Sequence, residues 1–363
     1  MSPGPGTRRP LAEHRRQIAF AYPGDLETPT GGYGYDRRII SGLREAGWQV
    51  DLVPLGEGFP FPEVSVLEEA VRRIGAVPVG SPIVIDGLAF GAMGEAADRL
   101  AKGRDLIALV HHPLFLENGL PEETADRLRT SEETALEQAW TIIVTSPATA
   151  AQVRDCFGIA EDKIHVVLPG TDRAMAEVRP ETDCPNLLSV GTIVPRKGYD
   201  LLFDALARLG DLSWRLDIVG DTTRDEACFQ WLCDRLRENG LEDRVTFHGA
   251  VSPEALPDFY GKADIFVLAS RYEGYGMAYT EALAHGLPVI GSGGGAVRET
   301  LPQGAALYCG VEDVGRLTAA LKRLISDRDE RKAFAEAARQ AAGALPTWQD
   351  AVNAFSAVLE DLK

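Results

Sequence analysis

The chain has 363 residues, of which 45% are hydrophobic and 25% are charged. This length exceeds what one hydrophobic core usually supports, which predicts two domains, and the longest apolar runs are far shorter than a membrane-spanning helix requires. The formal net charge of −17 argues against nucleic acid as a general partner, because phosphate binding needs a dense basic face. Five cysteines without a CxxC pair indicate reduced thiols rather than a disulfide framework or a zinc site.

Residues 1–16 are rich in proline, glycine and arginine, and they contain no apolar stretch of the kind that a secretory signal needs. We therefore expect residues 1–16 to form a disordered, solvated tail. The basic side chains of this tail leave open a local contact with a phosphate or an anionic membrane. The expected location is cytoplasmic, with membrane contact at most peripheral, at the inner face of the membrane.

Short β-rich apolar segments alternate with longer segments of helical periodicity along the rest of the chain. In the first half, strands are expected at Gln17–Tyr22, Gln49–Pro54, Pro82–Asp86, Asp105–Val110, Thr141–Thr145 and Lys163–Leu168. Residues 169–185 then interrupt the pattern with prolines and charges, which is typical of a connection between domains. In the second half, strands are expected at Leu187–Val190, Arg215–Val219, Arg244–Phe247, Asp264–Ala269, Pro288–Gly291 and Ala306–Tyr308.

This alternation predicts two doubly wound α/β domains, each with a parallel sheet between layers of helices. Such folds bind ligands at the carboxyl ends of their strands, so we expect a central cleft between the domains. The predicted N-terminal domain spans residues 17–170, the linker residues 171–186, and the C-terminal domain residues 187–345. Residues 346–363 carry apolar side chains at helical spacing and predict a last helix that packs back on the first domain.

The most informative segment is Ser270–Val289, which directly follows an apolar strand. Glu273 is expected in a glycine-rich turn, and Glu281 about two turns into a helix over residues 275–285. The start of such a helix offers amide hydrogens and a positive dipole end to an anion, and the two carboxylates can accept hydrogen bonds from hydroxyl groups. This segment therefore predicts a ligand that carries both phosphate and sugar hydroxyl groups.

The spacing of Glu273 and Glu281 resembles the E-x7-E signature of family 4, group 1 retaining glycosyltransferases. Three further segments resemble that family in order and spacing: Ser189–Leu202, Leu216–Asp221 and Val245–Gly249. The resemblance covers most of residues 187–310. It implies the GT-B fold, in which two Rossmann-like domains face a central cleft, and a nucleotide-sugar donor bound by the second domain.

The resemblance implies a role for each matching position of the second domain. Lys197 would hold the donor diphosphate as negative charge grows on it, and Arg196 would assist. Many family members carry an arginine where this chain has Thr192. Glu281 would bind the ribose hydroxyls and Glu273 a hydroxyl of the transferred sugar. The full expected donor-binding set is Gly31, Gly32, Thr192, Arg196, Lys197, Glu273, Gly274, Tyr275, Gly276, Met277 and Glu281.

In the first domain, Thr30–Tyr35 precedes a predicted helix over residues 36–46 and resembles the glycine-rich loop of the family. Its glycines would let backbone amides approach the diphosphate. His111 and His112 follow a predicted strand, and because adjacent strand residues point to opposite sides, one of them is expected to face the ligand. We favour His111, which joins Lys197 and Glu273 as the expected catalytic residues. Asp86 is expected either to reach the acceptor or to cap a helix, and His112 is the alternative sugar contact.

These expectations predict transfer of a hexose or hexosamine from a UDP- or GDP-sugar to a hydroxyl acceptor, with retention of anomeric configuration implied by the family. The acceptor would be a glycan, a lipid-linked molecule or a small molecule, bound mainly by loops 57–62 and 114–121. No cofactor or metal is expected, because no His, Cys or Asp cluster shows ligand spacing. The alternatives are a sugar-nucleotide epimerase or phosphorylase of the same fold, or a non-catalytic sugar-nucleotide-binding partner protein.

Overall fold

The computed structural model describes residues 16–174 and 182–361. Apart from Arg16, the tail predicted at residues 1–16 lies outside the described residues, as does part of the predicted linker. Among the described residues, no helix combines the length and the apolar character that a bilayer-spanning segment needs.

The first domain is built on a six-stranded parallel sheet with the strand order β2-β1-β3-β4-β5-β6. Adjacent residues of β4 face opposite sides: Leu106, Ala108 and Val110 enter one core, and Ile107 and Leu109 enter the other. This burial on both faces explains the continuous apolar runs in the sequence. The strands are β1 Gln17–Tyr22, β2 Gln49–Pro54, β3 Ile83–Asp86, β4 Leu106–Val110, β5 Thr141–Val144 and β6 Ile164–Val166.

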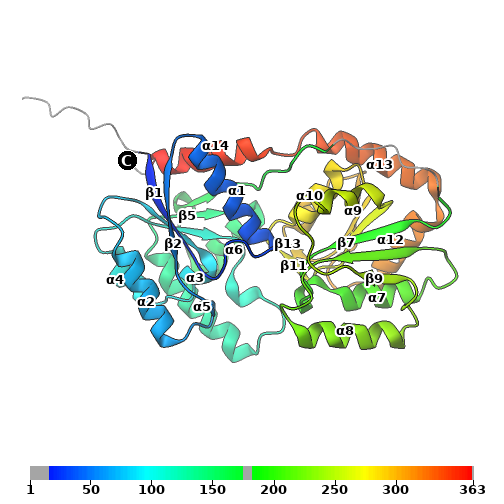
Figure 1. The fold of residues 1–363 in the computed structure, drawn as a ribbon, viewed down its shortest axis with the longest axis horizontal. Coiled ribbons are helices and arrows are strands. Elements are labelled where there is room, and N and C mark those ends of the chain that lie inside the picture. The colour runs from blue at the N-terminus through cyan, green and yellow to red at the C-terminus, as the bar shows by residue number, and fades with distance from the viewer. Residues whose placement is uncertain (1–15, 175–181, 362–363) are drawn as a thin grey trace, which may run out of the picture.

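Helices cover both faces of this first sheet (Figure 1). The α-helices are α1 Gly31–Glu45, α2 Val64–Gly75, α3 Gly87–Phe90, α4 Ala96–Ala101, α5 Glu122–Glu137 and α6 Pro147–Phe157. Short 3-10 helices follow at η1 Leu114–Leu116 and η2 Glu161–Lys163. The first of these carries part of the loop that follows β4, and therefore lies directly after the two predicted site histidines.

The second domain repeats this architecture with the strand order β14-β12-β10-β7-β8-β9. Its strands are β7 Asn186–Val190, β8 Arg215–Val219, β9 Val245–Phe247, β10 Ile265–Leu268, β12 Val289–Gly291 and β14 Ala306–Tyr308. Its helices are η3 Pro195–Lys197, α7 Tyr199–Ala207, α8 Glu226–Glu238, α9 Leu256–Lys262, α10 Met277–Ala284, α11 Val297–Thr300, α12 Val314–Ser326 and α13 Arg328–Ala342. A separate two-stranded ladder joins β11 Tyr272–Glu273 to β13 Gly294–Gly295.

The last helix, α14 (Trp348–Asp361), returns from the second domain and packs on α1 of the first (Figure 1). Phe355 of α14 is fully buried in the same core as Ile39 of α1. The two helices approach closely at Gly42, where an added Cβ atom would lie 2.2 Å from the Val352 side chain. Burial of a phenylalanine of this kind is worth roughly 3–5 kcal/mol against alanine, so α14 joins the two domains through the first core.

The start of helix α1 and the conformation at Glu273 differ from the sequence-based predictions, and both lie at the expected site. Helix α1 begins at Gly31 instead of Asp36, so the predicted glycine loop is the first turn of a helix. The Thr30 hydroxyl accepts a hydrogen bond from the Tyr33 amide and caps this turn, which outweighs the low helix propensity of the glycines. Glu273 lies in strand β11 rather than in a turn, because β11 pairs with β13.

Candidate functional site

The two domains touch directly beyond the ends of β4 and β10, where both sheets were expected to bind ligand. Gly274 packs on the backbone of His111, and a Cβ atom on Gly274 would lie 2.1 Å from the His111 carbonyl oxygen. The Thr149 hydroxyl donates to the Gly274 carbonyl at 3.2 Å, and the Tyr272 hydroxyl donates to Gln152. Position 274 thus requires glycine, and the predicted donor loop is held against the first domain.

Lys197 and Glu273 form a buried ion pair in the second domain. Lys197 is the last residue of η3, and its side chain packs over Gly191. Its Nζ lies 2.6 Å from Glu273 Oε1. The Ser270 hydroxyl donates to the same oxygen at 2.5 Å. The structure therefore brings together both predicted catalytic residues of this domain. Strand β11, paired with β13, fixes the backbone of Glu273.

The ionisation of this pair follows from burial and from the local excess of positive charge. Burial would raise the pKa of Glu273, but Lys197 and Arg196 outweigh it and lower that pKa to about 2. Burial also lowers the pKa of Lys197, against the pull of the Glu273 carboxylate. Within the second domain one carboxylate lies between two cations, and Glu117 of the first domain, whose pKa is lowered to about 2, supplies a second negative charge beside Arg196.

Arg196 is held by oxygen atoms from both domains. Its Nε donates to Glu117 of the first domain at 3.1 Å, and its NH1 donates to the Tyr272 carbonyl at 2.9 Å and lies 3.5 Å from Glu273. In this arrangement Arg196 spans the domain boundary. Thr192, which stands where the family commonly has arginine, lies half-buried in the loop after β7.

The N-terminus of α10 presents the amides that were expected to meet phosphate or sugar. The helix begins at Met277, two residues later than predicted, because Gly276 adopts φ = 91° at the N-cap position. Gly276 has no side chain that could cap this helix. The Tyr279 amide bonds the Gly276 carbonyl at 3.0 Å, while the Met277 and Ala278 amides precede the first i→i−4 hydrogen bonds of the helix. The Thr300 hydroxyl donates to the Tyr275 carbonyl at 2.7 Å and steadies the preceding turn.

Glu281 lies about one turn into α10, rather than two, because the helix starts later than predicted. Its Oε2 accepts a hydrogen bond from the Tyr260 hydroxyl at 2.8 Å. Burial raises the pKa of Glu281 to about 7, the Tyr260 bond opposes this rise, and the nearby Asp172 charge adds to it. A carboxylate with one oxygen anchored in this way can offer the other to ribose hydroxyls.

In the first domain, Gly31 and Gly32 form the first turn of α1. Their amides precede the first intrahelical hydrogen bonds and can therefore bind an anion. An added Cβ atom on Gly32 would lie 3.4 Å from the His111 ring, so this turn packs directly on that histidine. The structure thus brings the predicted glycines and His111 together.

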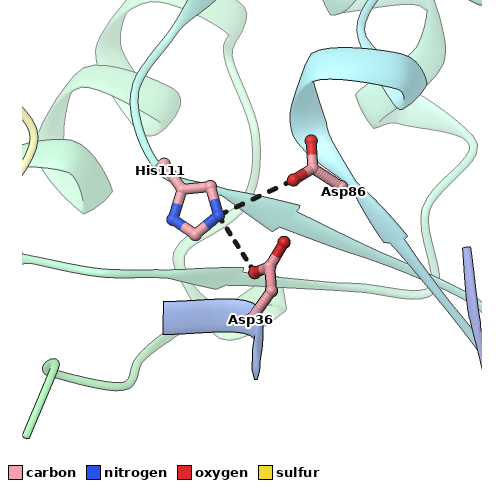
Figure 2. Close-up of side chains that lie close together, drawn as sticks. All are labelled: Asp36, Asp86 and His111. Carbon is pink, nitrogen blue, oxygen red and sulfur yellow. Dashed lines mark hydrogen bonds and ion pairs between the residues drawn. The ribbon is translucent and has the colours of Figure 1, made fainter. Parts of the chain in front are cut away.

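Figure 2 shows His111 pointing toward two buried aspartates, Asp36 of α1 and Asp86 at the end of β3. His111 Nε2 lies 3.2 Å from Asp36 Oδ1 and 3.8 Å from Asp86 Oδ2. The other oxygen of Asp86 accepts the Leu88 amide at 2.7 Å, so Asp86 caps α3 and faces His111 at once. Ligand-type atoms of this trio lie within 4.8 Å of one another. The expectation that no metal is required stays a prediction.

His112 points away from this cluster, toward the second domain. Its Nε2 lies 3.4 Å from Glu117, and its ring centroid lies 5.9 Å from that of Tyr272. Burial lowers the pKa of His112, against the pull of the Glu117 carboxylate. The two histidines therefore face different partners, as expected for adjacent residues at a strand end.

Sequence reasoning missed two charged groups of the site. Asp36 lies four residues after Gly32, which places it one helical turn further along α1 on the same face. A helix start at Gly31 would have revealed this spacing. Glu117 lies inside the loop predicted to contact the acceptor, and nothing in its local sequence pointed to Arg196, which lies 79 residues further along the chain.

The fold and these side chains define the class of the protein. A solved sucrose-phosphate synthase from Thermosynechococcus elongatus superimposes with a TM-score of 0.81 at 23% identity, covering 95% of this chain and 99% of that one. Two facing, doubly wound domains of this kind constitute the GT-B fold. The present chain has this fold.

Family sequence models define its membership more closely. The model described as "Glycosyl transferases group 1" matches residues 171–341, and the model described as "Glycosyltransferase Family 4" matches residues 83–174. The chain therefore belongs to the family 4, group 1 glycosyltransferases.

Two relatives are similar over different lengths. Mannosylfructose-phosphate synthase of Agrobacterium fabrum is 36% identical over 166 residues, which are 41% of this chain and 37% of that protein. A GDP-mannose-dependent alpha-(1-6)-phosphatidylinositol monomannoside mannosyltransferase of Mycobacterium tuberculosis is 28% identical over 321 residues, 82% of this chain and 79% of that one. The chain thus matches little more than a third of the first relative's length and most of the second's.

Proposed function

We propose that the protein is a retaining glycosyltransferase that moves a hexose or hexosamine from a nucleoside diphosphate sugar to a hydroxyl acceptor. The observation that carries this proposal is the arrangement around Glu273. Lys197 and the uncapped start of α10 offer charge and amides to a diphosphate, while Glu281 lies one turn further along the same helix, where it can accept ribose hydroxyls. Such a pairing of anion-binding and hydroxyl-binding groups suits a nucleoside diphosphate sugar.

In this mechanism, the bond from the anomeric carbon to the diphosphate oxygen breaks while a new bond forms from the same carbon to the acceptor oxygen. Lys197 compensates the negative charge that grows on the departing diphosphate. Glu273 orients the sugar because its carboxylate accepts a hydrogen bond from a sugar hydroxyl. The acceptor attacks the anomeric carbon on the face from which the diphosphate leaves, so the configuration is retained. The acceptor proton passes to an oxygen of the leaving phosphate on that same face.

The first domain would supply the acceptor site, with the loop that contains Glu117 at its edge. Its acceptor would be a glycan, a lipid-linked molecule or a small hydroxyl compound. We place the reaction in the cytoplasm, with membrane contact at most peripheral, and expect no metal to be required. Both relatives described above carry mannose in their names and one is named as GDP-mannose-dependent, so GDP-mannose is the first donor to test, beside UDP-sugars.

The direct test is nucleotide binding by the Glu281→Gln variant. Hydrogen bonds to a charged acceptor are worth about 1.5–3 kcal/mol, so the variant should bind its nucleotide roughly 10- to 100-fold more weakly. Because the pKa of Glu281 is about 7, wild-type affinity should rise from pH 6 to pH 8 as the carboxylate ionises, and the variant should lose this dependence. Thermal shift with UDP, GDP, ADP and their sugars provides the measurement.

A matched control is Glu336→Gln on the exposed face of α13, where the partners of Glu336 among the described residues are neighbours on its own helix. It should bind nucleotide like the wild type. Release of nucleotide is then followed with and without hydroxyl acceptors. Turnover without any acceptor would favour an epimerase, dependence on inorganic phosphate a phosphorylase, and tight binding without turnover a non-catalytic partner protein. If the wild type binds none of the nucleotides, the proposed function is wrong.

A further inference from the structure

The cluster of His111, Asp36 and Asp86 contains two carboxyl groups beside one imidazole, which is one carboxyl group more than its place in a binding site explains. The three side chains come from three elements of the first domain: the loop after β4, helix α1 and the end of β3 (Figure 2). Asp36 has no exposed surface and Asp86 is 3% exposed. Two carboxyl groups in such a position cannot both remain charged beside one imidazole without a large desolvation cost.

The polar contacts of the His111 ring with the described residues are made through Nε2. Nε2 bonds Asp36 at 3.2 Å, Gly32 packs on the ring, and Tyr35 meets it edge-on with centroids 5.5 Å apart. Among the described residues, Nδ1 has no hydrogen-bond partner. With 21% of the side chain exposed, Nδ1 is the ring atom left to address a ligand.

The charges that face this ring determine whether Nδ1 donates or accepts. A neutral imidazole that donates from Nε2 to a carboxylate has no proton on Nδ1, whereas an imidazolium carries protons on both nitrogens. Burial opposes the charged form of His111, but Asp36 and, more weakly, Asp86 outweigh it and raise the pKa of His111. Asp36, which also bonds Nε2, makes the larger contribution to the stability of the imidazolium.

The protonation of Asp86 makes this arrangement self-consistent. Burial, followed by the Asp36 charge, raises the pKa of Asp86 to about 8, against the pull of His111. Asp36 Oδ2 is buried without a hydrogen-bond partner among the described residues. A neutral Asp86 has a proton to share with this oxygen and adds no negative charge to the cluster.

We propose that Asp36 is a positioning residue for sugar transfer: its carboxylate fixes the His111 ring by Nε2 and holds it as an imidazolium, so that Nδ1–H is the hydrogen-bond donor presented to the sugar. The role of His111 toward the sugar rests on the proposed function, whereas the state of its ring does not. Asp36 thereby selects an oxygen lone pair of the ligand, rather than a hydroxyl proton, as the partner of His111.

The test compares wild type with Asp36→Asn, which keeps the shape of the side chain and removes its charge. Histidine labelled with ¹³C and ¹⁵N reports the protonation of each ring nitrogen, and His111→Asn assigns the signal. Loss of an adjacent opposite charge should lower the proton affinity of His111 about tenfold or more. The matched control is Asp217→Asn, which removes the aspartate bonded to His248 at 2.7 Å in the other domain and should leave the His111 signal unchanged.

A second readout is the pH profile of donor turnover, kcat/KM. The kcat/KM of Asp36→Asn relative to wild type should be highest at acid pH, where protonation of His111 depends least on the aspartate, and should fall as pH rises. A purely structural role for Asp36 would give a loss that does not depend on pH. If Asp36→Asn proves unstable, the wild-type signal alone decides: a neutral His111 ring at pH 7 overturns the proposal.

A divalent cation is the alternative occupant of the cluster. If Mn²⁺ or Zn²⁺ binds the wild type, perturbs the His111 signal and fails to bind Asp36→Asn, Nε2 is a metal ligand and carries no proton, which overturns the proposal. Absence of donor turnover in the wild type would refute the proposed function while leaving the measured state of His111 intact. The two failures are therefore distinguishable.

Discussion

Two buried ionic clusters lie on opposite sides of the domain boundary, and they respond to burial in opposite ways. In the second domain, burial and two cations act on Glu273, and the cations prevail, lowering its pKa to about 2. In the first domain, burial and a second carboxylate act on Asp86, and its pKa rises to about 8 although His111 is near. Burial is similar in both, so the ratio of cations to carboxylates decides the direction.

This difference suits the two clusters to different parts of one ligand. In the second domain Lys197 and Arg196 share the Glu273 carboxylate, with Glu117 of the first domain beside Arg196, and in the proposed function these cations would bind the diphosphate. The first-domain cluster has an excess of acid, which keeps one proton on Asp86 and favours one on His111, and so suits neutral hydroxyl and ring oxygens. In the proposed function, charge binding would therefore fall to the second domain and hydrogen-bond donation to the first.

The largest expected effect on stability comes from Glu273→Gln. This change leaves Lys197 and Arg196 buried with one carboxylate fewer, and breaking a buried pair by removing one partner costs about 3–5 kcal/mol. The pKa of Glu273 is lowered, so its contribution is present above the unfolded value near pH 4 and is lost as pH falls toward 2. Urea unfolding at pH 7 and at pH 3 measures both.

The double variant Lys197→Met with Glu273→Gln provides the control, because it removes both members of the pair. It should be more stable than Glu273→Gln alone. Equal stability of the single and double variants would contradict the view that an unpaired Lys197 causes the loss.

The second effect is on catalysis rather than stability. Lys197→Ala removes the charge placed to compensate the leaving diphosphate, and loss of one such stabilising group lowers kcat by about 100- to 1000-fold. Lys102→Ala, at an exposed ion pair with Asp98 on the first domain, is the matched control and should turn over normally. Steady-state kinetics with the donor identified by thermal shift provides the measurement. A change in KM alone would place Lys197 in ground-state binding instead.

The third effect concerns the stability contributed by the first-domain cluster. This contribution decreases as pH rises, whereas that of Glu273 increases. Because the pKa of Asp86 is raised to about 8, the folded protein binds a proton there that the unfolded chain releases near pH 4. Stability should therefore fall between pH 4 and pH 8, by up to about 1.4 kcal/mol per pH unit for a single proton. Asp86→Asn, which mimics the neutral acid, should flatten this slope in denaturant unfolding. An unchanged slope would show that Asp86 is ionised in the folded state.

Most of the fold could be predicted from the sequence because buried parallel strands are continuous apolar runs. The predicted strands from β1 to β14 match the structure within two residues at each end, apart from the two-residue strands β11 and β13. Those two depend on pairing between residues 272–273 and 294–295, which no local pattern reveals. Helix α1 starts early because Thr30 caps a turn that its glycines disfavour, a local hydrogen bond that outweighs propensity.

The candidate site was predictable where one motif carries several of its groups and unpredictable where groups meet across the fold. Glu273, Gly274, Gly276 and Glu281 lie in one segment, so the sequence alone places them near one another. Asp36 and Glu117 bond partners 75 and 79 residues away, so tertiary packing is needed to identify those partners. The choice between the two histidines likewise depends on what packs against each ring.

The smallest expected effect tests the ion pair that joins the two domains. Glu117 bonds Arg196 at 3.1 Å, and its side chain is 39% exposed, so Glu117→Gln should destabilise the protein by no more than about 1 kcal/mol. Its effect on binding is more informative. With one carboxylate fewer on Arg196, the guanidinium can engage a diphosphate more readily, and nucleotide affinity should rise a few-fold.

Calorimetric titration of the nucleotide at two salt concentrations checks this last prediction, since the gain should shrink as salt screens the added charge. Glu69→Gln, which removes an exposed carboxylate paired with Arg72 and Arg73 on α2, is the matched control and should leave affinity unchanged. A fall in affinity for Glu117→Gln would mean that Glu117 aims Arg196 at the ligand. In that case Arg196 of the second domain needs the Glu117 carboxylate of the first domain to hold its guanidinium in the orientation that binds the nucleotide.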